Sequence, residues 1–102
     1  MVLLDLQIFP NDKGESLTPY VSRCVDVIDK SGLAYQFTPM GTIIEGKWEH
    51  VMEVVTGCYK ALEKDCNRIT IAIKADYRAG DASRLKSKVD SVASTVGRSL
   101  ST

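Results

Sequence analysis

Two hydrophobic spacings follow one another along this chain of 102 residues, and their order restricts the folds that it can adopt. In four segments apolar residues recur at every second position, as in a half-buried β-strand. In three others they recur at every third or fourth position, as in an amphipathic helix. The strand segments are residues 2–9, 33–38, 42–45 and 69–77, and the helical ones are 17–28, 48–62 and 85–96.

Capping residues mark the ends of the helical segments. Ser16 or Thr18 is available as the N-cap of the first helix. Gly32 and Gly97 stand just after helical segments, where the chain often needs a positive φ. Gly57 lies inside the second helix, where glycine costs about 1 kcal/mol relative to alanine. We therefore expect a packing reason for Gly57.

The order of the segments is β-α-β-β-α-β followed by one more helix. It predicts a ferredoxin-like α+β fold, in which two crossover helices cover one face of a four-stranded antiparallel sheet. No linker or repeat divides the chain, so we expect a single domain over residues 1–102 with an extra C-terminal helix. We expect the first and last strands in the centre of the sheet, and its second face uncovered.

Alternation along the strands assigns each side chain to one of the two faces. The residues expected beneath the helices are Leu4, Leu6, Ile8, Tyr35, Phe37, Ile69, Ile71 and Ile73. Those expected on the uncovered face are Asp5, Gln7, Gln36, Thr38, Thr70, Lys74 and Asp76, with Leu3, Phe9, Ala34 and Ala72. This face mixes small apolar and hydrogen-bonding groups, and it lacks the aromatic platform on which RNA-binding domains of this topology stack bases.

Charge is balanced over the whole chain but not along it. Thirteen Lys and Arg match thirteen Asp and Glu, so no overall positive field attracts nucleic acid or an anionic membrane. Residues 1–67 contain six basic and ten acidic side chains, whereas residues 68–102 contain seven and three. We expect no nucleic-acid or membrane partner, but the asymmetry can orient one copy of the chain against another.

The N-terminal segment and the cysteines both indicate a cytoplasmic protein. The first residues have no basic region, and Asp5 interrupts their apolar run, unlike in a signal peptide or a membrane span. The three cysteines lack the spacing of a zinc site or a redox pair, so we expect reduced thiols and no bound metal. Cys24 and Cys58 fall on or beside apolar helix stripes and should lie in the core, whereas Cys66 follows a helix and could be exposed.

No catalytic constellation stands out in the sequence. The single histidine, His50, begins a helix among charged residues and is expected to be solvated. Residues 40–46 contain glycines but lack the Lys-Ser/Thr ending of a phosphate-binding loop. We therefore predict no catalytic residue and no cofactor, so that a protein other than an enzyme is favoured. An enzyme would have to use Glu45 or Asp76 as its acid or base.

Residues 38–48 are the most distinctive segment of the chain. Their two glycines let the backbone approach a ligand closely. Thr38 and Thr42 offer hydroxyls, Met40 is an adaptable apolar contact, and Glu45 can accept hydrogen bonds from a cation or an amino-heterocycle. An ordinary hairpin with its usual turn residues is the alternative interpretation of the same segment.

Three segments together resemble the YkoF-like small thiamine-binding proteins. They are residues 5–10 (DLQIFP), residues 38–46 (TPMGTIIEG) with Trp48, and residues 71–78 (IAIKADYR). The resemblance covers about residues 2–96. It implies a ferredoxin-like subunit that assembles through its sheets into dimers and often tetramers. It also implies that the protein binds thiamine, or its hydroxymethylpyrimidine part, without turning it over.

The resemblance and the composition of the uncovered face together suggest a ligand site near the 38–46 hairpin. An aminopyrimidine offers donors and acceptors to Thr38, Thr42 and a carboxylate. A thiazolium cation prefers a nearby anion, which suits Glu45, with Met40 or Phe9 as an apolar wall. The residues expected to contact the ligand are Thr38, Met40, Gly41, Thr42, Glu45, Gln7, Asp5 and Phe9.

Two other hypotheses remain open at the level of the sequence. Lys74 and Arg78, with Arg84, could form an anion site for a phosphorylated ligand or for the acidic half of a neighbouring subunit. Alternatively, the chain is a structural or interaction module whose uncovered face only builds an oligomer.

Overall fold

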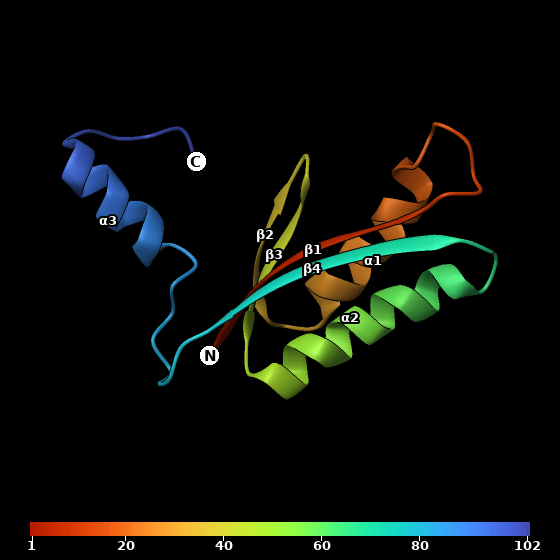
Figure 1. Ribbon diagram of the computed structural model, residues 1–102, viewed down its shortest axis with the longest axis horizontal. Helices are drawn as coiled ribbons and strands as arrows, with labels where there is room; N and C mark the ends of the chain where they lie inside the picture. Colours follow the sequence, from red (N-terminus) through yellow and green to blue (C-terminus); the bar gives the residue numbers. More distant parts are fainter.

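The computed structural model describes residues 1–102 and contains the expected order of elements (Figure 1). The elements are β1 (Val2–Pro10), α1 (Thr18–Lys30), β2 (Ala34–Thr38), β3 (Gly41–Gly46), α2 (Trp48–Glu63), β4 (Ile69–Tyr77) and α3 (Ser87–Val96). The prediction of a ferredoxin-like α+β fold with an extra C-terminal helix is thereby confirmed. None of the helices is both long and apolar enough to cross a membrane.

The four strands form one antiparallel sheet in the order β2-β3-β1-β4. The expectation that the first and last strands are central is therefore wrong, because β1 and β3 occupy the centre and β4 is an edge strand. The tight β2–β3 hairpin forces these two strands to be neighbours, and each helical crossover passes over one strand. As a result, β3 pairs beside β1, and β4 reaches the far side of β1.

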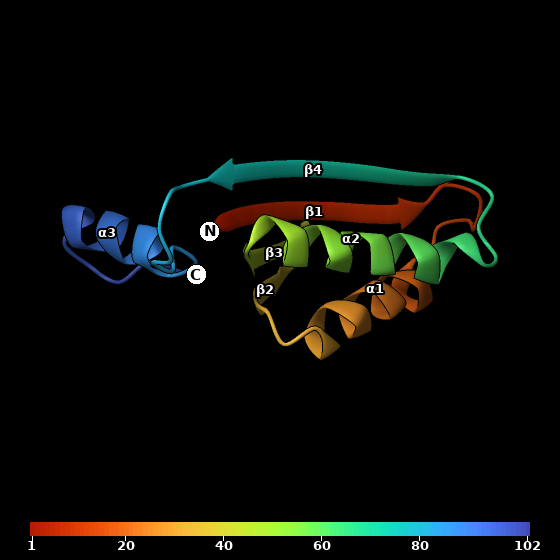
Figure 2. The same cartoon turned by 90° about the horizontal axis from the view of Figure 1, so that it is seen from below.

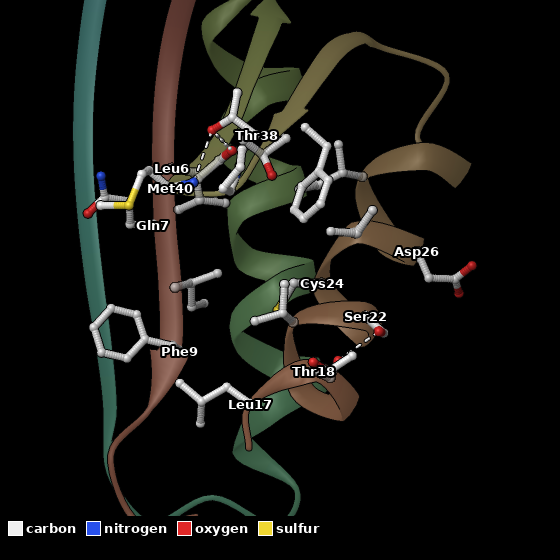
Figure 3. A pocket seen from close by; sticks show the side chains of 18 of the residues that line it. Leu6, Gln7, Phe9, Leu17, Thr18, Ser22, Cys24, Asp26, Thr38 and Met40 are labelled. Carbon is white, nitrogen blue, oxygen red and sulfur yellow. Dashed lines mark hydrogen bonds between the residues drawn. The ribbon is translucent and has the colours of Figure 1, made fainter. Parts of the chain in front are cut away.

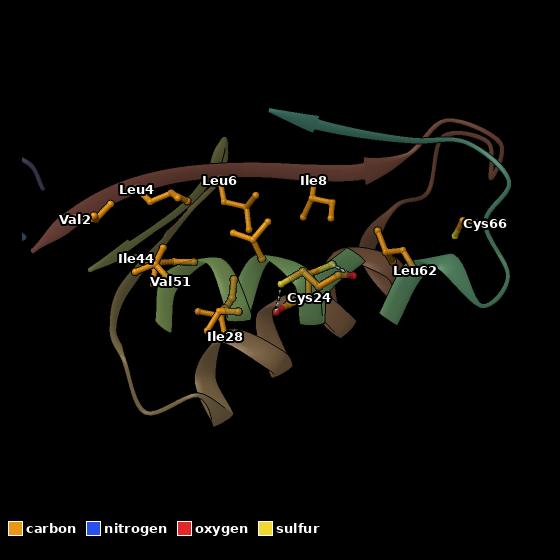
Figure 4. Packing of buried hydrophobic residues seen from close by; sticks show 13 residues of the cluster. Val2, Leu4, Leu6, Ile8, Cys24, Ile28, Ile44, Val51, Leu62 and Cys66 are labelled. Atoms are coloured by element: carbon orange, nitrogen blue, oxygen red, sulfur yellow. Dashed lines mark hydrogen bonds between the residues drawn. The ribbon is translucent and has the colours of Figure 1, made fainter. Parts of the chain in front are cut away.

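The hydrophobic core lies between one face of the sheet and helices α1 and α2 (Figures 2 and 4). Alternate side chains of β1 point into it from Val2 to Ile8, which confirms the alternation predicted for this strand. Cys24 and Cys58 are buried there, as expected. The core cluster consists of Val2, Leu4, Leu6, Ile8, Cys24, Ile28, Ile44, Val51, Val54, Val55, Cys58, Leu62 and Cys66.

Three residues expected beneath the helices are exposed, and Tyr35 and Ile69 are partly buried. Phe37, Ile71 and Ile73 are 53%, 41% and 42% exposed. Their side was predicted correctly, since Ile73 pairs with Leu6 across the sheet and therefore shares its face. However, α1 and α2 pack mainly against β1, β2 and β3. Ile69 still packs against the core, but the helix-side face of β4 is bare from Ile71 onward.

Cys66 corrects the expectation of an exposed thiol, because it is buried at the edge of the core. The cap prediction for the first helix is also wrong, since its N-cap is Leu17 and no side chain caps it. Gly32 and Gly97 follow their helices with φ of +78° and +86°, as expected. At Gly57 a Cβ atom would lie 2.9 Å from Val27 Cγ1, which supplies the packing reason for this glycine.

Helix α3 stands apart from the rest of the molecule. It follows a segment that leaves the end of β4, and it projects beyond the sheet in both views (Figures 1 and 2). None of its residues is buried. The molecule thus consists of a packed body, residues 1–77, and a C-terminal arm, which we define as residues 78–102.

Candidate functional site

A groove of about 1010 Å³ opens on the helix side of the sheet, between α1, β1 and the β2–β3 hairpin (Figure 3). It exists because β3 is shorter than β1. Pairing between the two strands ends at Leu6 and Thr42, so β1 continues from Gln7 to Pro10 without a neighbour on that side. The hairpin tip and the N-terminal half of α1 form the two walls of the opening. We call this feature the α1 groove.

The floor of the α1 groove is apolar and its walls carry aromatic rings. Leu6, Ile8, Cys24 and Ile28 form the buried floor. Phe37 contributes a half-exposed ring from β2, and Tyr35 of the same strand also lines the groove. Phe9 borders the groove, but its ring lies on the uncovered side of β1, because Phe9 follows the buried Ile8 (Figure 3). This arrangement can accept a flat heterocycle by burial of apolar surface and by ring stacking.

The charged residues that line the groove are all acidic. They are Glu15, Asp26 and Asp29, and no Lys, Arg or His lines it. The Tyr35 hydroxyl donates a hydrogen bond to Asp29 Oδ1 at 2.6 Å, which raises the pKa of that phenol. Lys30 Nζ lies 2.9 Å from Asp26 Oδ2, and this hydrogen bond raises the pKa of the lysine. The rim therefore favours a cation.

Three polar residues at the groove come from the predicted site. Thr38 Oγ1 donates a hydrogen bond to Gly41 O at 2.8 Å and accepts one from Met40 N at 3.2 Å, so it holds the hairpin turn. The Thr42 hydroxyl is part of the lining and has no hydrogen-bond partner within the chain. Gln7 borders the groove, but it alternates with the buried Leu6 and Ile8, so its side chain lies on the uncovered side of β1 (Figure 3). Of these residues, Thr42 therefore has hydrogen-bonding capacity directed into the groove.

Gly41 brings the hairpin close to β1. A Cβ atom at this position would lie 2.9 Å from Leu6 O and 3.0 Å from Gln7 Cγ. Only glycine fits this contact without a shift of the backbone. The glycine expected to allow close approach to a ligand thus allows close approach between two strands, at the edge of the α1 groove.

Two of the eight expected ligand residues do not line the groove. Asp5 pairs with Ile43 and Lys74 and lies on the uncovered face of the sheet. Glu45 is only 3% exposed. Its carboxylate accepts hydrogen bonds from Ser83 Oγ at 2.5 Å and from Arg84 N at 2.6 Å. The other six, Thr38, Met40, Gly41, Thr42, Gln7 and Phe9, all line the α1 groove.

The basic residues of the alternative anion site lie elsewhere. Lys74 and Arg78 are exposed on and just after β4, the strand farthest from the hairpin. Arg78 lines a second hollow of about 430 Å³ between the end of β4 and α3, which Arg84 and Lys88 also line. Arg84 Nη1 donates to Asp76 Oδ2 at 2.5 Å, so part of this positive charge is already paired. Lys74 lines neither cavity.

Helix α1 contributes most of the groove residues that the sequence did not reveal. Its lining residues include Leu17, Val21 and Val25 on the wall, with Asp26 and Asp29 on the rim. One signal was present: the apolar residues of this helix cover a wider arc than one core stripe requires. The extra arc indicates a second apolar contact, but it does not say whether a ligand or another chain makes it.

The groove holds no pair of groups typical of nucleophilic catalysis. Its one thiol, Cys24, faces the neighbouring helix, with Sγ 3.8 Å from Cys58 O. The hydrogen bond to Cys24 and burial raise the pKa of the Cys58 thiol. His50 is exposed on α2. No group of three or more His, Cys, Asp or Glu side chains is arranged to hold a metal ion.

Comparison with known proteins gives a consistent family. The family model described as "Thiamine-binding protein" matches residues 4–93. The UPF0045 protein sll0230 of Synechocystis is 33% identical over 92 residues, which cover 89% of this chain and 76% of that protein. The UPF0045 protein Mb1933 of Mycobacterium bovis is 34% identical over 92 residues, or 89% of this chain and 90% of that protein.

Solved structures show the same fold. Protein MJ1052 of Methanocaldococcus jannaschii superposes with a TM-score of 0.83 at 24% identity, over 90% of this chain and 95% of that one. A Thermotoga maritima protein provisionally assigned to thiamine biosynthesis or salvage gives a TM-score of 0.78 at 25% identity, over 89% and 97%. The family match and these likenesses span the same β-α-β-β-α-β body, and the chain therefore belongs to the thiamine-binding protein family.

Proposed function

We propose that this protein binds thiamine, or its hydroxymethylpyrimidine part, in the α1 groove and releases it unchanged. The observation that carries the proposal is the combination of aromatic walls with a rim that is acidic and has no basic residue. Thiamine is a cation made of two flat rings, so it matches both properties. The family match to thiamine-binding proteins supports the same ligand.

The proposed contacts follow from the chemistry of the lining. Phe37 offers a half-exposed ring face to a heterocycle. The free Thr42 hydroxyl can pair with the amino group or a ring nitrogen of the pyrimidine. Asp29 and Glu15 on the rim are the anions nearest to a thiazolium. Met40, at the exposed hairpin tip, can adapt to the ligand edge.

This assignment changes the role of two residues. Glu45 is engaged by Ser83 and Arg84, so we assign it to anchoring of the C-terminal arm rather than to ligand binding. Asp5, on the uncovered face, is likewise left out of the site. Thr38 and Gly41 keep a part in the site because they shape the hairpin wall.

The size of the ligand sets the expected affinity. Thiamine has about 18 heavy atoms, and about −0.3 to −0.5 kcal/mol per atom gives a binding free energy near −5 to −9 kcal/mol. The dissociation constant should then lie between high micromolar and submicromolar. The groove is larger than such a ligand needs, since ligand pockets usually measure about 300–1,000 Å³.

The acidic rim also distinguishes this proposal from a site for a phosphorylated ligand. A phosphate group near Asp29 or Glu15 would be repelled, so thiamine phosphate should bind more weakly than thiamine. The opposite preference would favour the basic residues Lys74 and Arg78 at the other edge of the sheet. We also propose a cytoplasmic homodimer or homotetramer with contacts through the sheet faces, because no helix covers the second face of the sheet.

Titration calorimetry with thiamine, hydroxymethylpyrimidine and thiamine phosphate tests the proposal. Thr42→Val keeps the shape of the side chain and removes its hydroxyl, so it should weaken thiamine binding by roughly 3- to 10-fold, the value of one hydrogen bond. Thr56→Val is the matched control, since the Thr56 hydroxyl is on the exposed side of α2 and bonds only its own helix at Met52 O.

Two results would contradict the proposal. One is the absence of heat and of any thermal stabilisation with thiamine and with hydroxymethylpyrimidine at millimolar concentration, because any ligand of the native state raises stability. The other is thiamine binding that Thr42→Val and Thr56→Val affect equally, which would move the site away from the α1 groove.

A further inference from the structure

We propose that the C-terminal arm is exchanged between two copies of this chain, so that α3 of each copy packs on the helix-side face of β4 in the other. The chain carries one bare apolar helix and one bare apolar strip of sheet. Each is the kind of surface that the other needs to be buried. The proposal concerns the edge of the sheet away from the α1 groove and does not depend on the ligand.

The bare strip of sheet consists of alternate residues of β4. Ile71 and Ile73 are more than 40% exposed, and Tyr77 at the end of the row is 70% exposed. They share the face of their partners in β1, which are Ile8, Leu6 and Val2 in that order and which the helices do bury. An apolar row of this kind beside a free strand edge is a site of association rather than an ordinary solvated surface.

The bare helix is α3. Its apolar stripe is formed by Val89, Val92 and Val96, at the spacing of one helix face, and Leu85 precedes it in the turn before the helix. Val92 and Val96 are exposed. A helix of ten residues is marginal in water without a partner. It is about 15 Å long, and Ile71 to Tyr77 extend over about 20 Å of strand. One α3 therefore matches one row of β4 in length.

Anchoring of the arm prevents α3 from covering its own β4. Glu45 holds Ser83 and Arg84 N at the end of the sheet. The Arg84 guanidinium donates to Asp76 O at 2.8 Å and to Met1 O at 3.4 Å. These bonds fix the arm just before α3 begins at Ser87. To fold back over its own strand, the arm would have to break them.

A second group of hydrogen bonds holds the arm closer to the end of β4. The amino group of Met1 donates hydrogen bonds to Arg78 O at 3.1 Å and to Gly80 O at 3.0 Å, and Arg78 N donates to Met1 O at 3.1 Å. The arm therefore leaves β4 along one fixed path, which takes α3 past the end of the sheet (Figure 1). An anchored arm directed away from its own body is the geometry of exchange between subunits.

The distribution of charge along the chain also favours a second copy as the partner of the arm. Residues 1–67 carry six basic and ten acidic side chains, and residues 84–98 carry Arg84, Lys86, Lys88 and Arg98 against Asp90 alone. Helix α2, which packs on β1, the strand beside β4, has three glutamates and one lysine. A basic arm on the acidic body of a second copy brings opposite charges together. Because each copy gives one helix and receives one, the two contacts are identical and the assembly is closed.

Two charge substitutions test the exchange by analytical ultracentrifugation. Val92→Lys places a cation in the α3 stripe, and Ile73→Asp places an anion in the β4 row. Each should weaken self-association at least about tenfold. Mixing the two variant chains should restore it. In the mixed dimer one contact is unmodified, and in the other the new lysine meets the new aspartate.

Control variants separate this interface from other surfaces. Ser94→Lys adds the same charge on the opposite side of α3 and should leave the assembly intact. Ala72→Asp places an anion on the uncovered face of β4, where it tests contact through the sheet faces. The circular dichroism of each variant checks folding, and every substituted side chain is exposed.

The proposal is overturned if the unmodified chain remains monomeric at high concentration, or if Val92→Lys and Ile73→Asp leave its association unchanged. It is also overturned if each variant alone is dissociated and the mixture of the two does not associate. That result would indicate that α3 contacts α3, and β4 contacts β4, in the assembly. Failure of this experiment leaves the proposal of ligand binding intact, because no ligand takes part in it.

Discussion

The two edges of the sheet differ in how much of their helix-side face is covered. On the β2 side, α1 stands against the sheet and leaves a lined groove above a buried floor. On the β4 side neither α1 nor α2 reaches the apolar row. The clearest pair is Leu6 and Ile73, which are direct cross-strand partners, yet Leu6 is buried and Ile73 is largely exposed. Adjacent residues on one face can therefore have opposite surroundings.

The same two edges differ in charge. The groove rim is acidic, whereas basic residues predominate in the C-terminal arm that follows β4. The difference in coverage has a topological cause, because the crossover that places β4 outside β1 also takes it beyond the two helices. The difference in charge comes from the sequence itself. We expect that the chain's own helix α1 covers the β2 edge and leaves a groove there for a small ligand. We expect that a second copy of the chain covers the β4 edge.

The largest expected effect is a difference in stability between variants of Leu6 and of Ile73. Leu6→Ala removes a buried side chain and should lower the free energy of unfolding by about 2–5 kcal/mol. Ile73→Ala should cost less than about 1 kcal/mol in dilute solution, because its side chain is already in contact with water. Urea unfolding at low and high protein concentration measures both. A larger cost of Ile73→Ala at high concentration would sharpen the comparison, and equal costs in dilute solution would break it.

The next effect concerns the anchor of the arm. Glu45→Gln keeps the size of the side chain and removes the charge that receives two hydrogen bonds, which should cost about 1.5–3 kcal/mol of local stability. Amide hydrogen exchange should become faster in residues 78–86, while the affinity for thiamine should not change. Glu49→Gln, on the exposed start of α2, is the control. Loss of thiamine binding without faster exchange would return Glu45 to the ligand site.

A smaller effect tests the charges of the two edges. Asp29→Asn should reduce the affinity for thiamine by roughly two- to fivefold, the value of an exposed ion pair, and added salt should reduce this difference. Lys74→Gln should leave thiamine affinity unchanged. Calorimetry on both variants gives the comparison directly. If Lys74→Gln had the larger effect, the ligand would be bound at the β4 edge.

The smallest effect is a pH dependence of stability that comes from an ion pair on the surface of the packed body. Arg23 Nη1 donates a hydrogen bond to Asp65 Oδ1 at 2.7 Å, and this bond lowers the pKa of Asp65 from 3.8 to about 2. Because the folded pKa is the lower one, the stabilisation is complete above about pH 4 and is lost as the pH falls towards 2. Melting temperatures of the native chain and of Asp65→Asn should converge over this range. A difference in melting temperature that stays constant down to pH 2 would contradict this prediction.

The order of elements could be predicted from the sequence because period-2 and helical spacings are local signals. The order of the strands and the coverage of β4 could not, because both depend on where the crossovers place distant segments. Ile71 and Ile73 have the same alternation as Leu6 and Ile8, and nothing within their own segment indicates that the helices fall short of them.

The candidate site shows the same limit. Thr42 and Glu45 are three residues apart in one strand, so alternation alone places them on opposite faces. This local argument is sufficient to separate the two side chains. That Glu45 is held by Ser83, thirty-eight residues later, cannot be inferred from the sequence of the hairpin. The wall provided by α1 also depends on the tilt of that helix. The sequence of α1 determines this tilt only in part, because the segments packed against the helix determine it as well.

The close contact at Gly57 has a consequence for how the α1 groove can move. There α1 and α2 approach so closely that a single methyl group would collide with Val27, and the two thiols beside it are held in place, with Cys58 Sγ 3.5 Å from Cys24 O and Cys24 Sγ 3.8 Å from Cys58 O. We therefore expect this crossing to stop α1 from sliding along α2, while the N-terminal end of α1, which is farther from it, can shift. Ligands of different size would then be accommodated at the mouth of the groove, and its floor would keep one shape.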